Sequence, residues 1–119
     1  MLDISVKDEE ITISLGIKII EVKENVSGDN DGEFRKFLTD HSSPQSCPRV
    51  ILDLSRMRFI NSSGLGAIAN MSMRLRKKQG QLVIVSPNKE LTQVFTITKL
   101  EQVLNIVNNI DAAIDFFKS

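Results

Sequence analysis

The chain is poor in the side chains that build covalent crosslinks and transition-metal sites. Its 119 residues include one cysteine, Cys47, and one histidine, His41. A single cysteine excludes a disulfide within the chain, and one additional histidine leaves too few soft ligands for a zinc site. This usage is typical of a reducing compartment, so we expect a cytoplasmic protein without a metal ion or other cofactor.

Net charge and long apolar runs are also missing. Fifteen basic residues balance fifteen acidic ones, and a pI of about 6.6 gives no overall attraction to nucleic acid or to an anionic membrane. No apolar run approaches the roughly 20 residues of a membrane-spanning helix, and residues 1–4 lack the basic and apolar regions of a signal peptide. We expect a soluble, unprocessed chain that inserts into no membrane and recognises its partner through a local surface.

The apolar pattern predicts one α/β domain over residues 1–119. A chain with 41% hydrophobic residues is able to bury roughly two thirds of its unfolded surface in a single core. Strand-like and helix-like periods alternate along the sequence, which is typical of mixed architecture. The first three apolar segments form either two strands or three. The strands are expected at residues 2–6, 11–15, 17–22, 50–54, 81–85 and 104–107.

Turn and capping residues mark the expected helices. Residues 8–10 predict a turn, and Asn30 with Glu33 resembles a capping box that opens a short helix through residues 34–38. Residues 41–48 form a polar loop, which we expect to be the most flexible segment. The later helices run from the serines at 62 and 63 to a stop at Gly80, from a cap at Asn88 through residue 98, and from about residue 111 onward.

Two of the expected strands are apolar at nearly every position. Residues 50–52 read VIL and residues 82–85 read LVIV. This is the pattern of strands that are buried on both faces, because helical crossovers connect parallel neighbours. We therefore predict a mixed, mostly parallel sheet of about four to five strands, covered by about four helices.

Two adjacent serines lie between a predicted buried strand and a predicted amphipathic helix. Ser62 and Ser63 follow Asn61 in the segment FINSSGLG, residues 59–66. At a helix start the first backbone N–H groups lack partners, and the helix dipole favours negative charge. An exposed serine at this junction is suited to carry a phosphate, whereas the alternative interpretation of Ser62 is a simple N-cap.

Several segments carry a family resemblance. They are the strand at 50–54, the junction at 61–66, the helix end KQG at 78–80, the segment QLVIVSP at 81–87 and the element TKL at 98–100. Together they resemble a STAS domain of the bacterial anti-sigma factor antagonist type. The resemblance covers nearly the whole chain and implies a single STAS domain, 1–119.

The resemblance implies a regulatory binding module rather than an enzyme. In this family the unmodified domain binds an anti-sigma factor that is also a serine kinase, and so frees a sigma factor. Phosphorylation of the junction serine releases the partner, and a serine phosphatase is a further expected partner. The family's acceptor is the first serine of the junction, which is Ser62 in this chain.

The residues around Ser62 are expected to shape the junction and the partner surface. Asn61 and Ser63 are assigned to capping and positioning. Gly64 either lets a partner approach the backbone or packs the helix tightly against the sheet. A helical projection places further residues on the flank nearest Ser62, as candidates for partner contact. These candidates are Gly66, Asn70, Met73, which the pattern also allows at the border of the core, and Lys77.

Two departures from the family pattern favour a second interpretation. Asn61 stands where the family usually has Asp, and Ser27 stands where a Gly-x-Leu-Asp element commonly ends in Asp. Asn61 preserves the turn and cap geometry but supplies neither a carboxylate for a kinase's metal ion nor a negative charge beside the acceptor. The alternative function is a STAS scaffold that works without phosphorylation, in a signalling assembly or in a lipid or solute transport system. The oligomeric state stays open.

Other kinds of site have weaker support in the sequence. Residues 29–33 partly resemble a calcium loop, but Ser27 and Leu38 occupy positions where calcium ligands are needed. No Gly-x-Ser-x-Gly element surrounds Ser62, so a serine hydrolase is not expected. The basic run at 74–78 is the pattern of a solvated helix face, with an acidic partner as the alternative.

Overall fold

A computed structural model describes residues 1–7 and 10–118, with residues 10–12 described by their backbone alone. The strands in this part of the chain are β1 (Ile4–Lys7), β2 (Lys18–Val22), β3 (Arg49–Asp53), β4 (Gln81–Val85) and β5 (Asn105–Val107). They form one five-stranded sheet in the order β1-β2-β3-β4-β5. β1 runs antiparallel to β2, and the remaining pairings are parallel. The expected mixed, mostly parallel sheet is confirmed.

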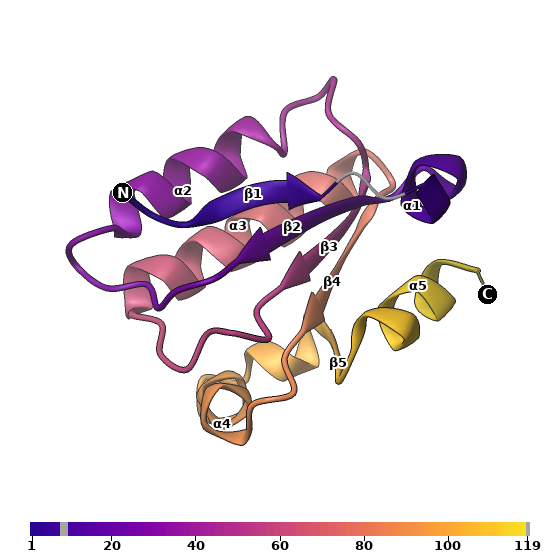
Figure 1. The fold of residues 1–119 in the computed structure, drawn as a ribbon. Coiled ribbons are helices and arrows are strands. Elements are labelled where there is room, and N and C mark those ends of the chain that lie inside the picture. The colour runs from indigo at the N-terminus through magenta and orange to yellow at the C-terminus, as the bar shows by residue number, and fades with distance from the viewer. Residues whose placement is uncertain (8–9, 119) are drawn as a thin grey trace.

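Helices cover both faces of this sheet (Figure 1). They are α1 (Glu10–Leu15), α2 (Asp31–Asp40), α3 (Ser62–Lys77), α4 (Lys89–Ile97) and α5 (Ile110–Lys118), with a 3-10 turn, η1 (Leu100–Gln102), before β5. α2 and α3 lie side by side on one face, to which α4 also contributes, and α5 packs on the other. Over residues 1–7 and 10–118, no helix combines the length and the apolar character needed to cross a bilayer.

Side chains of the central strands alternate between two apolar clusters. Val50 and Leu52 of β3 pack in the cluster with α2, α3 and α4, whereas Ile51 packs in the cluster with α5. Successive side chains of a strand point to opposite faces of its sheet, so a strand covered on both faces needs apolar residues in a row. This double coverage explains the continuous apolar runs of β3 and β4, and it confirms the prediction that both strands are buried on both faces.

The expectation of a strand at residues 11–15 is wrong, because α1 covers this segment. The sequence ITISL has apolar side chains at every second position, but the first and fifth residues of any such segment also share a helix face. Leu15 packs partly buried against the α5 cluster, whereas Ile13 is 67% exposed on the opposite side. The N-terminal region therefore contributes two strands.

A turn was also expected at residues 8–10. Asp8 and Glu9 lie outside the described residues, and Glu10 begins α1.

The expected capping box at the start of α2 is also not formed. Asn30 is the N-cap by position, but its side-chain oxygen accepts a hydrogen bond from the backbone N–H of Ser27 at 2.9 Å, not from a helix N–H. The Glu33 carboxylate accepts from the backbone N–H of Leu2 at 3.1 Å. Both side chains satisfy backbone donors outside the helix, so Asn30 closes the preceding turn and Glu33 holds the N-terminal segment beside α2.

Gly80 follows α3 as predicted, but for a different reason from the one expected. The left-handed residue at the helix end is Gln79, with φ of 62°. A Cβ atom on Gly80 would lie 2.1 Å from the carbonyl oxygen of Pro48, closer than any real contact. Glycine is needed here because the loop at 41–48 crosses against the backbone.

Candidate functional site

The junction before α3 is held in place by a short parallel bridge to a loop near the N-terminus. Val26 and Ile60 form this bridge, in which the Val26 N–H donates to the Phe59 carbonyl at 3.1 Å and the Asn61 N–H donates to the Val26 carbonyl at 3.0 Å. Val26 and Ile60 are buried, so they anchor the connection between β3 and α3 to the core. The start of α3 is thereby fixed relative to the sheet.

Asn61, and not either serine, is the N-cap of α3. Its backbone is extended, with φ of −82° and ψ of 174°, and its side-chain oxygen accepts the Gly64 N–H at 2.9 Å. The assignment of Ser63 to capping is therefore corrected. Asparagine is among the best capping residues, and a single side-chain oxygen suffices for this bond. Within residues 1–7 and 10–118, neither Ser62 nor Ser63 uses its hydroxyl in a hydrogen bond.

Ser62 is exposed at the first position of α3, and Ser63 is half-buried. Among the described residues, no acceptor is present for the backbone N–H groups of Ser62 and Ser63, whereas those of Gly64 and Leu65 bond to Asn61. Free N–H groups and the positive end of the helix dipole favour an anion at this place. The site thus joins an accessible hydroxyl to a helix start that tolerates negative charge.

Gly64 is a packing residue. It is buried, and a Cβ atom there would lie 2.6 Å from Cγ1 of Ile60 and 3.0 Å from Cγ1 of Val26. Of the two alternatives open for Gly64, close packing has this direct support, and a buried backbone offers no access to a partner. Gly66 differs, because it is exposed and a Cβ atom there would contact nothing within 4 Å.

A solvent-exposed stripe continues from Ser62 along α3. Its members share one side of the helix, since they follow each other at intervals of three or four residues. Met73 is 56% exposed, so it does not belong to the border of the core. The stripe consists of Ser62, Gly66, Asn70, Met73 and Lys77, all of which are exposed. Their role in binding a partner stays a prediction.

Two polar residues that the sequence analysis missed also contact the junction. The side-chain oxygen of Asn25 accepts the backbone N–H groups of Arg58 and Phe59, at 2.8 and 3.1 Å. The carboxylate of Asp31, in the first turn of α2, accepts a hydrogen bond from the side-chain amide of Asn61 at 3.0 Å. Both contacts join positions at least 30 residues apart, and no local sequence pattern carries that information.

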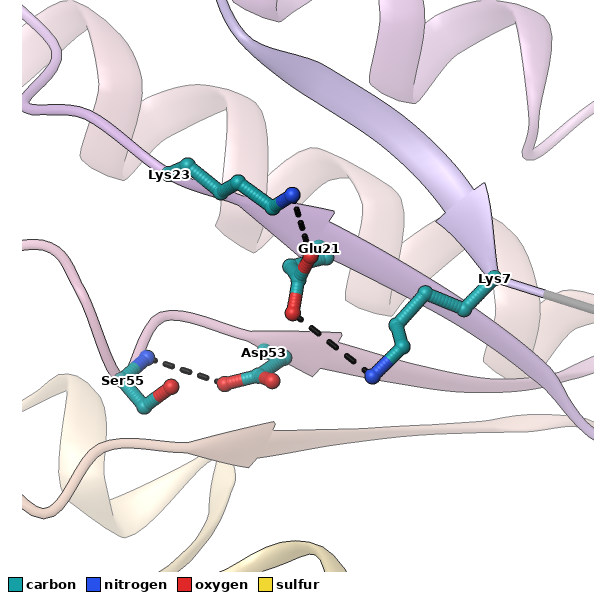
Figure 2. Close-up of polar contacts among 5 residues, drawn as sticks. All are labelled: Lys7, Glu21, Lys23, Asp53 and Ser55. Atoms are coloured by element: carbon teal, nitrogen blue, oxygen red, sulfur yellow. Dashed lines mark hydrogen bonds and ion pairs between the residues drawn. The ribbon is translucent and has the colours of Figure 1, made fainter. Parts of the chain in front are cut away.

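A second group of polar residues lies at the ends of β2 and β3 (Figure 2). Glu21 lies between Lys7 and Lys23, with N···O distances of 3.7 and 3.3 Å. Asp53, which is the register partner of Glu21, is 5% exposed and accepts the Ser55 N–H at 2.9 Å. The lysines offset the charge of Glu21, and Asp53 closes the turn after β3. The carboxylates of Glu21 and Asp53 are therefore both engaged in structural contacts.

Titratable side chains that gather elsewhere lie away from the junction. Lys18, at the start of β2, places its ammonium 3.1 Å from Nδ1 of His41. Burial lowers the pKa of His41, and the neighbouring charge of Lys18 lowers it further. The junction instead follows the far end of β3, a parallel neighbour of β2, so His41 is not placed to act on Ser62. In the part of the chain that the structure describes, no three metal-ligating side chains gather.

Comparison with known proteins places this geometry in a family. A model of the STAS domain matches residues 9–113. BtrV of Bordetella bronchiseptica, named as a candidate anti-sigma factor antagonist, is 34% identical over 71 residues, which are 60% of this chain and 61% of BtrV.

Solved structures share the fold at lower identity. An anti-sigma factor antagonist from Mycobacterium paratuberculosis superposes with a TM-score of 0.85 at 18% identity, covering 100% of this chain and 96% of that one. The Bacillus cell fate determinant SpoIIAA in its phosphorylated form gives a TM-score of 0.66 at 18% identity, over 93% and 97% of the two chains. At these identities the structures show a shared fold and nothing further. With the family model matched over most of its length, this chain belongs to the STAS domain family.

Proposed function

We propose that the chain is an anti-sigma factor antagonist that switches partners, with Ser62 as its phosphoacceptor. The observation that carries the proposal is that the cap of α3 and the exposed hydroxyl belong to two different residues. Asn61 makes the cap with Gly64, which leaves the Ser62 hydroxyl exposed and without a partner among the described residues. A phosphate on Ser62 would therefore leave the cap between Asn61 and Gly64 in place.

A phosphate on Ser62 would change the surface without unfolding the domain. It adds roughly two negative charges and three acceptor oxygens at neutral pH. The N–H groups of Ser62 and Ser63 have no acceptor among the described residues and lie at the positive end of the dipole of α3, so they stabilise the added charge. A partner surface that is acidic or tightly desolvated is repelled, and the switch acts at the interface.

The exposed stripe on α3 supplies the partner surface beside the acceptor. Gly66 has no side chain, so a partner backbone is able to approach α3 one turn beyond Ser62. Met73 adds an exposed apolar side chain, and Asn70 and Lys77 add polar contacts. A surface with a small flat region and one adaptable apolar residue suits protein recognition.

The expected partner is an anti-sigma factor with serine kinase activity, and a serine phosphatase would return the domain to its binding form. BtrV and the Mycobacterium protein are named as antagonists and not as enzymes. We accordingly assign Ser62 the role of a substrate and assign no catalytic residue. The cytoplasm is the compartment in which this role would be exercised.

The second candidate function is a STAS scaffold that works without phosphorylation. The observation that favours it is the neutral N-cap Asn61 at a helix with no acidic residue in its first turn. The start of α3 therefore offers no carboxylate of its own to a kinase's metal ion. A scaffold would bind its partner equally well with or without a phosphate at Ser62.

The test is incubation with Mg-ATP and the cognate kinase, chosen from histidine-kinase-type ATPases encoded beside the gene for this chain. Intact mass should show one added phosphate, which Ser62→Ala should abolish. Ser63→Ala is the matched control, since Ser63 is the neighbouring serine and also makes no cap bond; it should retain the modification. Phosphate that persists in Ser62→Ala would refute the acceptor assignment, and an unmodified wild type would favour the scaffold.

A further inference from the structure

The carboxylate of Asp31 reaches the start of α3 from a different helix. Asn61 uses both ends of its side-chain amide: the oxygen accepts the Gly64 N–H at 2.9 Å, and the nitrogen donates to Oδ2 of Asp31 at 3.0 Å. Asp31 is in the first turn of α2, so one side chain ties together the first turns of two neighbouring helices. Asn61 directly precedes Ser62, so this carboxylate is bonded to the residue next to the acceptor in the chain.

Asp31 is also the acidic group that is tied to this helix start. α3 itself has no acidic residue in its first turn, and Asn61 is neutral. Asp31 is half-buried, and its place in the first turn of α2 favours a negative charge there. The charge is therefore held in a fixed position by the amide of Asn61 and is not on a freely moving surface side chain.

We propose that Asp31 is a specificity-determining residue for phosphorylation of Ser62, because its carboxylate supplies the negative charge that a cationic group in the kinase active site recognises beside the acceptor. This inference rests on the proposed function. A kinase binds its nucleotide with Mg²⁺, so a cation lies close to the transferred phosphoryl group. A carboxylate beside the acceptor attracts that cation and orients the serine toward the nucleotide.

The reaction is an ordinary phosphoryl transfer from ATP. Oγ of Ser62 forms a bond to the γ-phosphorus, and the bond from that phosphorus to the bridging β–γ oxygen breaks, so ADP leaves with the bonding electron pair. The hydroxyl proton passes to a base of the kinase. Asp31 takes no proton and forms no covalent bond, because its proposed role is to attract and orient.

The decisive variant is Asp31→Asn, which keeps a side-chain oxygen to accept the Asn61 amide but removes the charge. Asp29→Asn is the matched control. Asp29 is exposed, lies two residues earlier, and makes no hydrogen bond within the described residues. With the cognate kinase and Mg-ATP, kcat/KM for Asp31→Asn should fall about fivefold, the size expected for one partly exposed charge, and Asp29→Asn should match the wild type.

Two further readouts separate a charge effect from a structural one. Added KCl should slow phosphorylation of the wild type more steeply than that of Asp31→Asn, because only the wild type has the charge to screen. Asn61→Asp on the Asp31→Asn background returns a carboxylate to the junction and should restore most of the lost rate. The reciprocal variant also keeps an amide–carboxylate hydrogen bond between positions 31 and 61, so the difference in KCl dependence is the readout that a merely structural role would not give.

The outcomes distinguish the inference from the proposed function. Wild type and Asp31→Asn phosphorylated at Ser62 at equal rates would overturn the inference and leave the proposed function intact. A slow Asp31→Asn variant that Asn61→Asp fails to rescue would also overturn it. A wild type that no kinase preparation modifies would instead remove the proposed function.

Discussion

The side-chain oxygen of Asn61 accepts the backbone N–H of Gly64 at 2.9 Å, and this bond caps α3 without help from either serine. An N-cap bond of this kind stabilises a protein by roughly 0.5–2 kcal/mol. Because Asn61 carries this function, Ser62 and Ser63 are released from it. The structural role and the proposed regulatory role of the junction therefore fall on adjacent but different residues.

Asn61→Ala should lower the free energy of unfolding by about 1 kcal/mol, because Gly64 loses its acceptor. Asp31 loses its donor in the same variant. Ser62→Ala and Ser63→Ala should leave stability within about 0.5 kcal/mol of the wild type. Urea unfolding of the three variants measures this directly. A cap formed by a serine would reverse the order of the effects.

Gly64→Ala and Gly66→Ala should have opposite consequences, although both add one methyl group to α3. At Gly64 the new Cβ atom meets Ile60 and Val26, so unfolding free energy should fall by about 1–3 kcal/mol. At Gly66 the space is open, and alanine should stabilise the helix by up to about 1 kcal/mol. Thermal unfolding of the pair provides the comparison. Equal effects would show that Gly64 is not packed as described.

Arg49 should be a stabilising link between the C-terminal ends of α1 and α5. Its guanidinium donates to the Leu15 carbonyl at 2.7 Å and to the Phe117 carbonyl at 2.5 Å, and lies 5.0 Å from the centre of the Phe117 ring. Arg49→Ala should cost about 2 kcal/mol of unfolding free energy. The exposed Arg56 offers a control, since Arg56→Ala should change stability little.

His41 should make stability depend on pH as the pH falls below the usual histidine pKa of 6.5. Burial and the adjacent Lys18 lower its pKa below the usual 6.5, while Asp40 opposes this shift. As pH falls below that value the unfolded chain takes up the proton first, so the His41 contribution to stability is present above pH 6.5 and is lost on acidification. His41→Gln should flatten this part of the profile. An unchanged slope would show that another group titrates there.

The sequence predicts most of this fold because the relevant signals are local. The apolar runs of β3 and β4, the cap at Asn88 and the break before Ser62 each lie within a few residues. α1 was missed because all three apolar side chains of this five-residue segment fit one face of a strand, whereas only the first and the fifth residue share a helix face. Gly16 follows α1 with a φ of 69°, a left-handed conformation that ends the helix and turns the chain toward β2.

In the candidate site, too, the features set by local spacing are predictable from the sequence, whereas those set by tertiary contacts are not. Exposure of Ser62, Gly66 and Met73 follows from helical spacing, and the structure places them as the projection suggested. The contacts of Asn25 and Asp31 with the junction do not follow, because the tertiary fold alone brings these distant residues together. The packing of Gly64 against Ile60 and Val26 likewise needs the bridge between two distant segments.

Negative charge at Ser62 should weaken partner binding without disturbing the fold. The most direct measurement is calorimetric titration of the cognate anti-sigma kinase with the unmodified protein and with the protein phosphorylated at Ser62, alongside thermal unfolding of both forms. We predict a loss of at least about tenfold in affinity, which is 1.4 kcal/mol, at an unchanged midpoint of unfolding. Equal affinity of the two forms would show that phosphorylation of Ser62 does not control partner binding.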